Sequence, residues 1–194
     1  MSCEKQGFST YVFSTSEVHI SEEHVSYLAK METTFSGSEF WLYDSGEDCA
    51  DTKVMENYKR QLAYINYYQD DNRPRAFDAY ITNCDNKSTD FTIIDKKNQN
   101  PIQNKWNHHY RKKLTMLNTK EPTYDPQEQN YKLDFKGLAG VPSIKNFILE
   151  NEAYPDAMIF GKQDKDTFLL RLMAPLSLVQ GAAICLSSIH YKFL

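Results

Sequence analysis

Two arginines on either side of a proline are the residues best suited to bind an anion. Arg73-Pro74-Arg75 precedes Ala76–Ile81, a run of strand-forming residues. Pro74 favours an extended backbone at Arg73, so we expect Arg75 at the mouth of a strand. Two guanidinium groups held close together there would attract phosphate. The alternative is that both arginines are ordinary solvated residues at a strand end.

A lysine lies on the polar side of an earlier alternating segment. In Val25–Met31 the odd-numbered residues are apolar, and Lys30 points to the other face. Gly37 interrupts this run before Phe40–Tyr43, a second run with strong strand propensity, which ends in the turn sequence Asp44-Ser45-Gly46. We expect the two segments to form a hairpin that presents Lys30 away from the core.

Other clusters of chemically active residues are weaker. His19 and His24, with Glu22 and Glu23, contain metal-binding groups, but they lack helical spacing and neighbouring cysteines, which favours a polar loop. His108-His109 precedes a basic run and indicates a basic surface rather than a catalytic pair. The sequence has no nucleophile elbow, P-loop or dinucleotide fingerprint. We therefore expect no catalytic residues, no metal and no cofactor.

The composition is that of one globular domain. The 194 residues are 41% hydrophobic and 25% charged, with a net charge of −4. This negative charge disfavours binding of nucleic acid or acidic membranes through a global field, so an anion would need a local basic cluster. The four cysteines have no paired spacing, and Met1–Gly7 has no apolar run. We expect a reducing compartment and no signal peptide.

The most distinctive segment is Ala174–Ile189, which contains no charged residue. Pro175 suits the first turn of a helix, and the segment is too short and too polar to span a bilayer. We expect a helix surrounded by protein, with Ile184 on its polar side beside Gln180 and three serines. The broad apolar side contains Leu178, Val179, Ala182, Ala183, Cys185, Leu186 and Ile189.

Everything before this helix has strand character, which predicts a mainly β (α+β) fold in which strands surround a buried C-terminal helix. The expected strands are Tyr11–Ser14, Val25–Met31, Phe40–Tyr43, the end of 58–68, Ala76–Ile81, Phe91–Ile94, Leu114–Leu117, Tyr131–Phe135, Ser143–Leu149, Ala157–Gly161 and Thr167–Leu172.

Several short motifs, in their order and spacing, resemble the C-terminal domain of the tubby family. They are Phe40–Gly46, Tyr131–Gly137, Ser143–Phe147, Met158–Lys162, Lys165–Phe168, Pro175–Gln180 and Ala182–Ser188. The resemblance covers residues 9–189 and implies a closed antiparallel barrel threaded by a hydrophobic helix. This chain begins at what would be an internal strand of that barrel. We therefore expect Tyr11–Ser14 to be a sheet edge, either covered by Met1–Ser9 or paired with another chain.

The resemblance also implies a function and a site. Tubby-like domains are phosphoinositide-binding adaptors, and Lys30 matches a lysine of the family's binding site. Arg75 matches the family's arginine directly after a proline, with Arg73 beside it, and Thr10 aligns with an asparagine that hydrogen-bonds the headgroup. Glu32 stands where the family has a second basic residue, so we expect weak binding.

The expected partners are a phosphatidylinositol bisphosphate headgroup and a protein cargo, without nucleic acid. This implies a cytoplasmic protein that associates peripherally with the inner face of the plasma membrane and takes part in protein trafficking, with the cilium and the nucleus as alternative locations. The alternative is a protein-interaction or structural module that has lost lipid binding, which Glu32 favours.

Overall fold

The computed structural model describes residues 9–47, 51, 53–54, 57–70, 73–82, 92–94, 99–106 and 114–191. Nine strands form one sheet in the order β1-β2-β3-β4-β5-β6-β9-β10-β11, and all neighbouring strands are antiparallel. The strands are β1 (Ser9–Ser14), β2 (Tyr27–Thr33), β3 (Glu39–Asp44), β4 (Gln61–Asp70), β5 (Arg73–Thr82), β6 (Leu114–Thr119), β9 (Phe147–Glu150), β10 (Met158–Lys162) and β11 (Phe168–Leu172).

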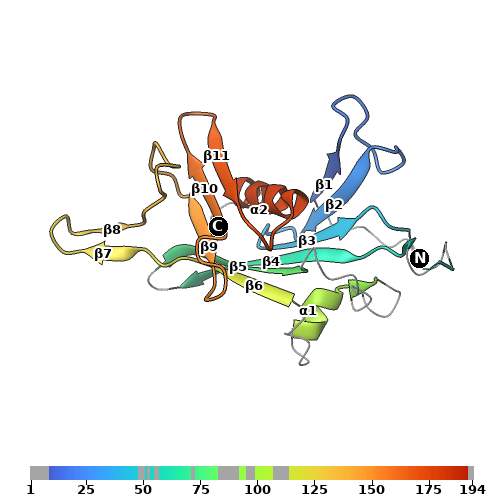
Figure 1. The fold of residues 1–194 in the computed structure, drawn as a ribbon, viewed down its shortest axis with the longest axis horizontal. Coiled ribbons are helices and arrows are strands. Elements are labelled where there is room, and N and C mark those ends of the chain that lie inside the picture. The colour runs from blue at the N-terminus through green and yellow to red at the C-terminus, as the bar shows by residue number, and fades with distance from the viewer. Residues whose placement is uncertain are drawn as a thin grey trace.

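The sheet curves around helix α2 (Leu178–His190), as Figure 1 shows. Strands β10 and β11 stand on one side of the helix, β1 and β2 on the other, and β3–β5 lie beneath it. The expected mainly β fold around a C-terminal helix is therefore confirmed. None of the helices in the described ranges is long and apolar enough to cross a bilayer.

The resemblance implies a closed barrel, but the start of this chain at an internal strand left its closure open, and the described residues do not close the sheet. Within the described residues, β1 pairs only with β2 and β11 pairs only with β10, so these two strands are the edges of an open sheet. Tyr11–Ser14 belongs, as predicted, to a strand at the edge of the described sheet, while residues 1–8, which were expected as one possible cover of this edge, lie outside the described residues. No described strand lies between the two edges to join them.

The orientation of α2 differs from the prediction. Its polar side is buried, because Gln180 donates hydrogen bonds to the carbonyl oxygens of Leu62 and Thr82, each 3.0 Å away. Leu178 and Ile189, expected to face protein, are 74% and 42% exposed. Hydrogen bonds to strand carbonyls allow the polar residues to be buried, and so override the simple apolar pattern.

The helix also starts later than expected, at Leu178 rather than near Pro175. Ser177 has an extended backbone and is the N-cap. Its hydroxyl accepts a hydrogen bond from the Gln180 N–H (3.2 Å), while the Gln180 side chain accepts one from the Ser177 N–H (2.9 Å). This reciprocal capping box fixes the helix start.

The sheet has two apolar faces of unequal size. Toward α2, a continuous core includes Ala29, Met31, Phe40, Leu42, Ala63, Ile65, Phe77, Ala79, Phe147, Leu149, Met158 and Ile184. On the opposite, outer face, helix α1 (Pro101–Trp106), which the sequence did not predict, covers a small cluster of Tyr64, Tyr80, Ile102 and Leu114. Side chains alternate between these faces along each strand.

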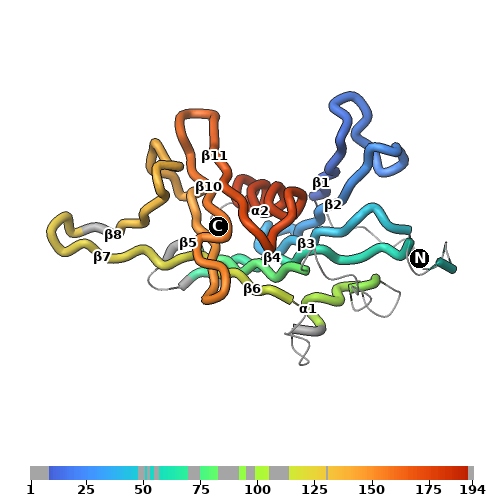
Figure 2. The backbone as a smooth tube through the Cα atoms, in the orientation of Figure 1, coloured from blue at the N-terminus to red at the C-terminus, as the bar shows by residue number. Residues whose placement is uncertain are grey.

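Two other expected strands differ from the structure: one is shorter than predicted, and the other is only an isolated bridge. Of the predicted strand Tyr131–Phe135, only Tyr131 and Lys132 lie in a strand, β8 (Asn130–Lys132), which pairs with β7 (Thr123–Asp125). Figure 2 shows this hairpin extending away from the rest of the fold. In the predicted strand at 91–94, Phe91 lies outside the described residues, and Ile93 forms an isolated bridge with Arg60.

The predicted strand at 143–149 also begins later. The Asn146 N–H donates to the Ser143 carbonyl (3.0 Å), so this segment forms a turn before β9 starts at Phe147. The turn brings the carbonyl of Ile144 close to the C-terminal end of α2, where it accepts a hydrogen bond from Arg75.

Candidate anion-binding site

Lys30 lies in the middle of β2 on the outer face of the sheet. Its neighbours Ala29 and Met31 are fully buried against the α2 side, so alternation directs Lys30 the other way, as predicted. Its ammonium nitrogen is 3.2 Å from a carboxylate oxygen of Glu22 and 3.2 Å from one of Glu32. The side chain is only 18% exposed, so this lysine is held between two carboxylates.

The electrostatic surroundings of Lys30 are therefore acidic. Burial alone would lower the pKa of Lys30, but Glu32 and Glu22 oppose it and the net pKa is raised. Burial, with added contributions from Glu22, Asp44 and Glu32, raises the pKa of the nearby Tyr27 to about 12. Lys30 is thus fully protonated at neutral pH, but its charge is balanced by its neighbours.

A second lysine shares a small polar cleft with Lys30. The cleft has a volume of about 170 Å³ and is lined by Lys30, Glu32, Tyr43, Lys59, Ile94 and Gln99. Lys59 was not predicted. It precedes β4, at the start of segment 58–68, of which only the end was expected to be a strand. No spacing in the sequence connects Lys59 with Lys30.

The turn after β3 positions Lys59. The Asp44 carboxylate accepts hydrogen bonds from the N–H groups of Gly46 (3.1 Å) and Arg60 (2.8 Å). Burial raises the pKa of Asp44 despite these two donors. A Cβ on Gly46 would lie 2.6 Å from the backbone of Lys59, so only glycine permits this approach. The Tyr-Asp-x-Gly sequence therefore places Lys59 beside the cleft.

Thr10 lies close to the same site. It is the exposed cross-strand partner of Glu32 in the β1–β2 pair, and Val12 is the partner of Lys30. Directly paired residues in antiparallel strands share a face. The structure therefore brings Thr10, Lys30 and Glu32 together on the outer face.

Arg75 occupies a different place. Its guanidinium donates to the Ile144 carbonyl (2.6 Å), the Ser188 carbonyl (2.6 Å) and the Ser188 hydroxyl (3.0 Å). It also lies 5.3 Å from the Tyr67 ring centroid and 5.2 Å from that of Tyr191. Arg75 thus joins β5, a loop and the C-terminal turn of α2, where a cation is favourable for the helix dipole.

Lys30 and Arg75 are on opposite faces of the sheet, so the structure does not bring them together. Arg75 contacts α2, whereas Lys30 faces away from it. Arg73 starts the backbone of β5, and its side chain lies outside the described part of the structure. The prediction that Arg73 and Arg75 bind one phosphate together therefore concerns a side chain outside the described part of the structure.

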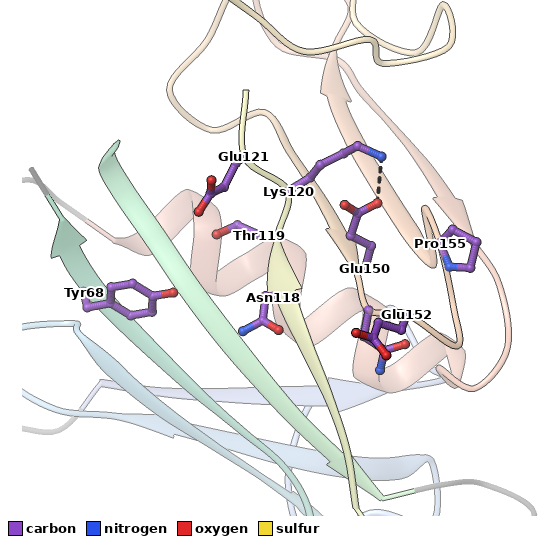
Figure 3. Close-up of a pocket in the computed structure, with 9 residues that line it drawn as sticks. Tyr68, Asn118, Thr119, Lys120, Glu121, Glu150, Glu152 and Pro155 are labelled. Carbon is purple, nitrogen blue, oxygen red and sulfur yellow. Dashed lines mark hydrogen bonds and ion pairs between the residues drawn. The ribbon is translucent and has the colours of Figure 1, made fainter. Parts of the chain in front are cut away.

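A larger hollow lies elsewhere on the outer face, at the ends of β6 and β9. It has a volume of about 620 Å³, and its lining includes Lys120, Glu121, Glu150 and Glu152. Figure 3 shows the Lys120 ammonium joined to the Glu150 carboxylate. These two groups are 2.7 Å apart, and a carboxylate oxygen of Asp156 lies 3.0 Å from the same ammonium. Carboxylates outnumber the single cation here, so this hollow does not suit an anionic headgroup.

The histidines considered as metal ligands lie in the loop between β1 and β2. The rings of His19 and His24 stack with centroids 4.4 Å apart. His24 Nδ1 is 2.8 Å from the Ser26 hydroxyl. Among the residues that the structure describes, no group of three potential ligands is arranged to hold a metal ion.

Sequence comparisons agree with this architecture. The model of the Tub family matches residues 2–191, and the chain therefore belongs to the Tub family. It is 27% identical to Tubby protein homolog 1 of Caenorhabditis elegans and 26% identical to human Tubby-related protein 3, covering 97% of this chain in both cases. Protein king tubby 1 of Aedes aegypti is 26% identical, also over 97% of this chain.

The chain corresponds to only part of these relatives. It spans 46% of the nematode protein, 44% of the human protein and 46% of the mosquito protein.

Proposed function

We propose that this protein is a non-enzymatic adaptor that binds a phosphoinositide headgroup in the cleft formed by Lys30 and Lys59. The observation that carries the proposal is that two lysines line one polar cleft on the outer face. Lysine ammonium groups bind phosphate as point charges with several donors. Thr10, beside Glu32 on the neighbouring strand, offers a hydroxyl to the same ligand.

The carboxylates of Glu22 and Glu32 limit the affinity of this site. Both carboxylates contact Lys30, so a phosphate must either take their place at the ammonium or bind beside two negative charges. We infer weak binding that is sensitive to salt, because these charges are partly exposed and screened. Such binding supports reversible attachment to the cytoplasmic face of a membrane while another surface carries a protein cargo.

Cosedimentation with phosphatidylcholine vesicles, with and without phosphatidylinositol bisphosphate, tests the proposal. The parent should bind only the vesicles that contain the phosphoinositide, and Lys30→Ala and Lys59→Ala should each reduce binding. Lys120→Ala is the matched control, because Lys120 also pairs with two carboxylates but lies in the other hollow. Equal losses in all three variants, or no binding by the parent, would reject the proposal.

A protein-interaction module without lipid binding is the second candidate. It is favoured by the two ion pairs that already occupy Lys30. In this case Lys30 stabilises the loop that contains Glu22, and Lys30→Ala would lower the melting temperature although the parent bound no vesicles. The vesicle and melting measurements together separate the two functions.

A further inference from the structure

The loop that joins β1 to β2, residues 15–26, exposes three aliphatic side chains. Val18, Ile20 and Val25 are 82%, 62% and 96% exposed. Neither apolar cluster of the described fold includes any of them. Figure 1 shows the loop projecting beyond the end of the β1–β2 pair. Single exposed apolar residues are normal on a protein surface, but three on one projecting loop indicate a contact site.

Polar groups within the loop hold its shape. The His19 carbonyl accepts hydrogen bonds from the hydroxyls of Ser14 (3.0 Å) and Ser26 (3.2 Å). The Ser16 hydroxyl accepts hydrogen bonds from the N–H groups of Val18 (3.3 Å) and His19 (3.1 Å). The aliphatic side chains take no part in these bonds. The loop is therefore preformed, which lowers the entropy that it loses when these side chains are buried by a partner.

The same loop is attached to the cleft proposed for the headgroup. Glu22 lies between Ile20 and Val25 in the sequence, and its carboxylate is 3.2 Å from the Lys30 ammonium. Lys30 faces the outer side of the sheet, so this ion pair holds the loop on that side. The exposed aliphatic residues and the two lysines of the cleft therefore belong to one surface.

We propose that Val18, Ile20 and Val25 insert into the apolar boundary of a lipid bilayer while the cleft holds the phosphoinositide headgroup. The inference rests on the proposed function, because the bound headgroup is what places the loop at the bilayer surface. Headgroup phosphates lie in the polar layer directly above the acyl chains, so side chains beside the cleft reach that boundary. The strength of such attachment increases with the apolar area that is buried.

The charges of the loop decide which membranes it can enter. Glu17 and Glu23 are exposed and, together with Glu22, make the loop acidic. A negatively charged lipid surface repels such a loop, so it should not adsorb to anionic lipids by itself. Insertion contributes only where the cleft already holds the loop at the surface. Phosphoinositide content, rather than general negative charge, should therefore control attachment.

Vesicle cosedimentation of loop variants tests the insertion. Val18→Ser/Ile20→Ser/Val25→Ser should weaken binding to phosphatidylcholine vesicles that contain phosphatidylinositol bisphosphate by about tenfold or more, because its loop no longer buries aliphatic side chains. The melting temperature should stay unchanged, since these side chains are outside the core. The parent should not bind vesicles of phosphatidylcholine and phosphatidylserine.

Phe35→Ser is the matched control. Phe35 is 91% exposed, in the turn at the other end of β2. This turn belongs to the α2 side, because a Cβ on Gly37 would lie 3.1 Å from the His190 ring. The control should bind phosphoinositide vesicles like the parent. Equal losses in the control and the triple loop variant would indicate general apolar adsorption and would reject the insertion.

A fluorescent probe gives a second readout. With Cys3, Cys49 and Cys84 replaced by serine, an environment-sensitive fluorophore attached to Val25→Cys should brighten on phosphoinositide vesicles. The same fluorophore on Phe35→Cys should not. No brightening at Val25, in a protein that sediments with these vesicles, would overturn the inference.

Titration with soluble inositol trisphosphate separates this inference from the proposed function. The parent and the triple loop variant should bind it equally, because the cleft is intact in both. If the parent binds neither the soluble headgroup nor the vesicles, the proposed function fails and the insertion fails with it. If both proteins bind phosphoinositide vesicles equally well, the insertion alone is wrong.

Discussion

At the scale of single residues, Lys30 and Arg75 were both expected to bind an anion, but they have different surroundings in the structure. Lys30 is held by two carboxylates at the edge of a polar cleft, whereas Arg75 connects strand, loop and helix through three hydrogen bonds. The position of Arg75 after a proline resembled a ligand-binding arginine. In the fold, its guanidinium donates hydrogen bonds to Ile144 and Ser188 of the protein itself.

Arg75→Ala should therefore destabilise the fold. Loss of the guanidinium leaves the Ser188 carbonyl without this donor and removes contacts with two aromatic rings, at a cost of about 2–4 kcal/mol. Arg75→Lys should retain only part of the lost stability, because an ammonium group lacks the planar arrangement of donors of a guanidinium. Chemical denaturation measures both variants. A loss of vesicle binding without a loss of stability would contradict the structural role.

The buried thiol of Cys185 gives a prediction about pH. Burial raises its pKa from 9.0 to about 12, so the folded protein keeps the thiol neutral while the unfolded chain ionises at about pH 9. This contribution to stability is complete below about pH 9 and is lost as pH rises toward 12. Between these limits, the parent should lose more unfolding free energy than Cys185→Ala. Equal losses would show that the thiol is not buried in solution.

At the scale of elements, the central question is which side of α2 is the core. Ile184 is fully buried, although its helical neighbours Gln180, Ser187 and Ser188 are polar. The Ser187 hydroxyl donates to the Ile184 carbonyl (2.8 Å) and is 3.0 Å from the Tyr67 hydroxyl. These bonds make burial of the polar side possible.

Ile184→Asp should consequently unfold most of the protein. An unpaired buried carboxylate costs about 3–5 kcal/mol, a large part of the stability of a domain. Ile144→Asp is the matched control, because this isoleucine is 64% exposed in a loop. Thermal melting should show a large loss for the first variant and little change for the second. Similar melting temperatures would mean that α2 does not pack on the sheet through Ile184.

Much of this level of structure could be predicted from local sequence. The alternation around Lys30, the turn at Asp44 and the uncharged C-terminal segment each indicated the correct element. The buried side of α2 could not be predicted, because the carbonyl partners of Gln180 come from Leu62 and Thr82, far away in the chain. Helical periodicity contains no information about such distant acceptors.

The candidate site was predictable only in part, for the same reason. Lys30 could be placed by the alternation within its own strand, and Thr10 by the resemblance to the tubby family; the structure shows that both belong to one strand pair. Lys59 reaches the cleft through the close approach of Gly46 to its backbone, a contact that depends on the folded turn. Arg75 acquired its role from Ser188 and Ile144, which only the completed fold brings near.

At the scale of the whole molecule, the open sheet separates two surfaces with different chemistry. The outer face carries the cleft of Lys30 and Lys59, while the α2 side carries exposed Leu178 and Ile189 between two strand edges. A headgroup bound at the first surface would not contact the exposed side chains of the second. This division suits an adaptor that joins a membrane to a protein.

The central claim is that Lys30 binds a phosphoinositide phosphate against the opposition of Glu22 and Glu32. For a phosphate bound about 6–7 Å from each carboxylate, at an effective dielectric of about 20–80, the repulsion from one carboxylate amounts to about 1–3 kcal/mol before salt screening. Removing both charges in Glu22→Gln/Glu32→Gln should therefore tighten binding about tenfold or more. The matched control, Glu150→Gln/Asp156→Asn, makes the same charge change around Lys120.

Vesicle cosedimentation at low and physiological salt measures all three proteins directly. The account predicts that the double variant at Lys30 binds phosphoinositide vesicles more tightly than the parent, while the control at Lys120 changes little. No gain in the first variant, or an equal gain in the control, would contradict it.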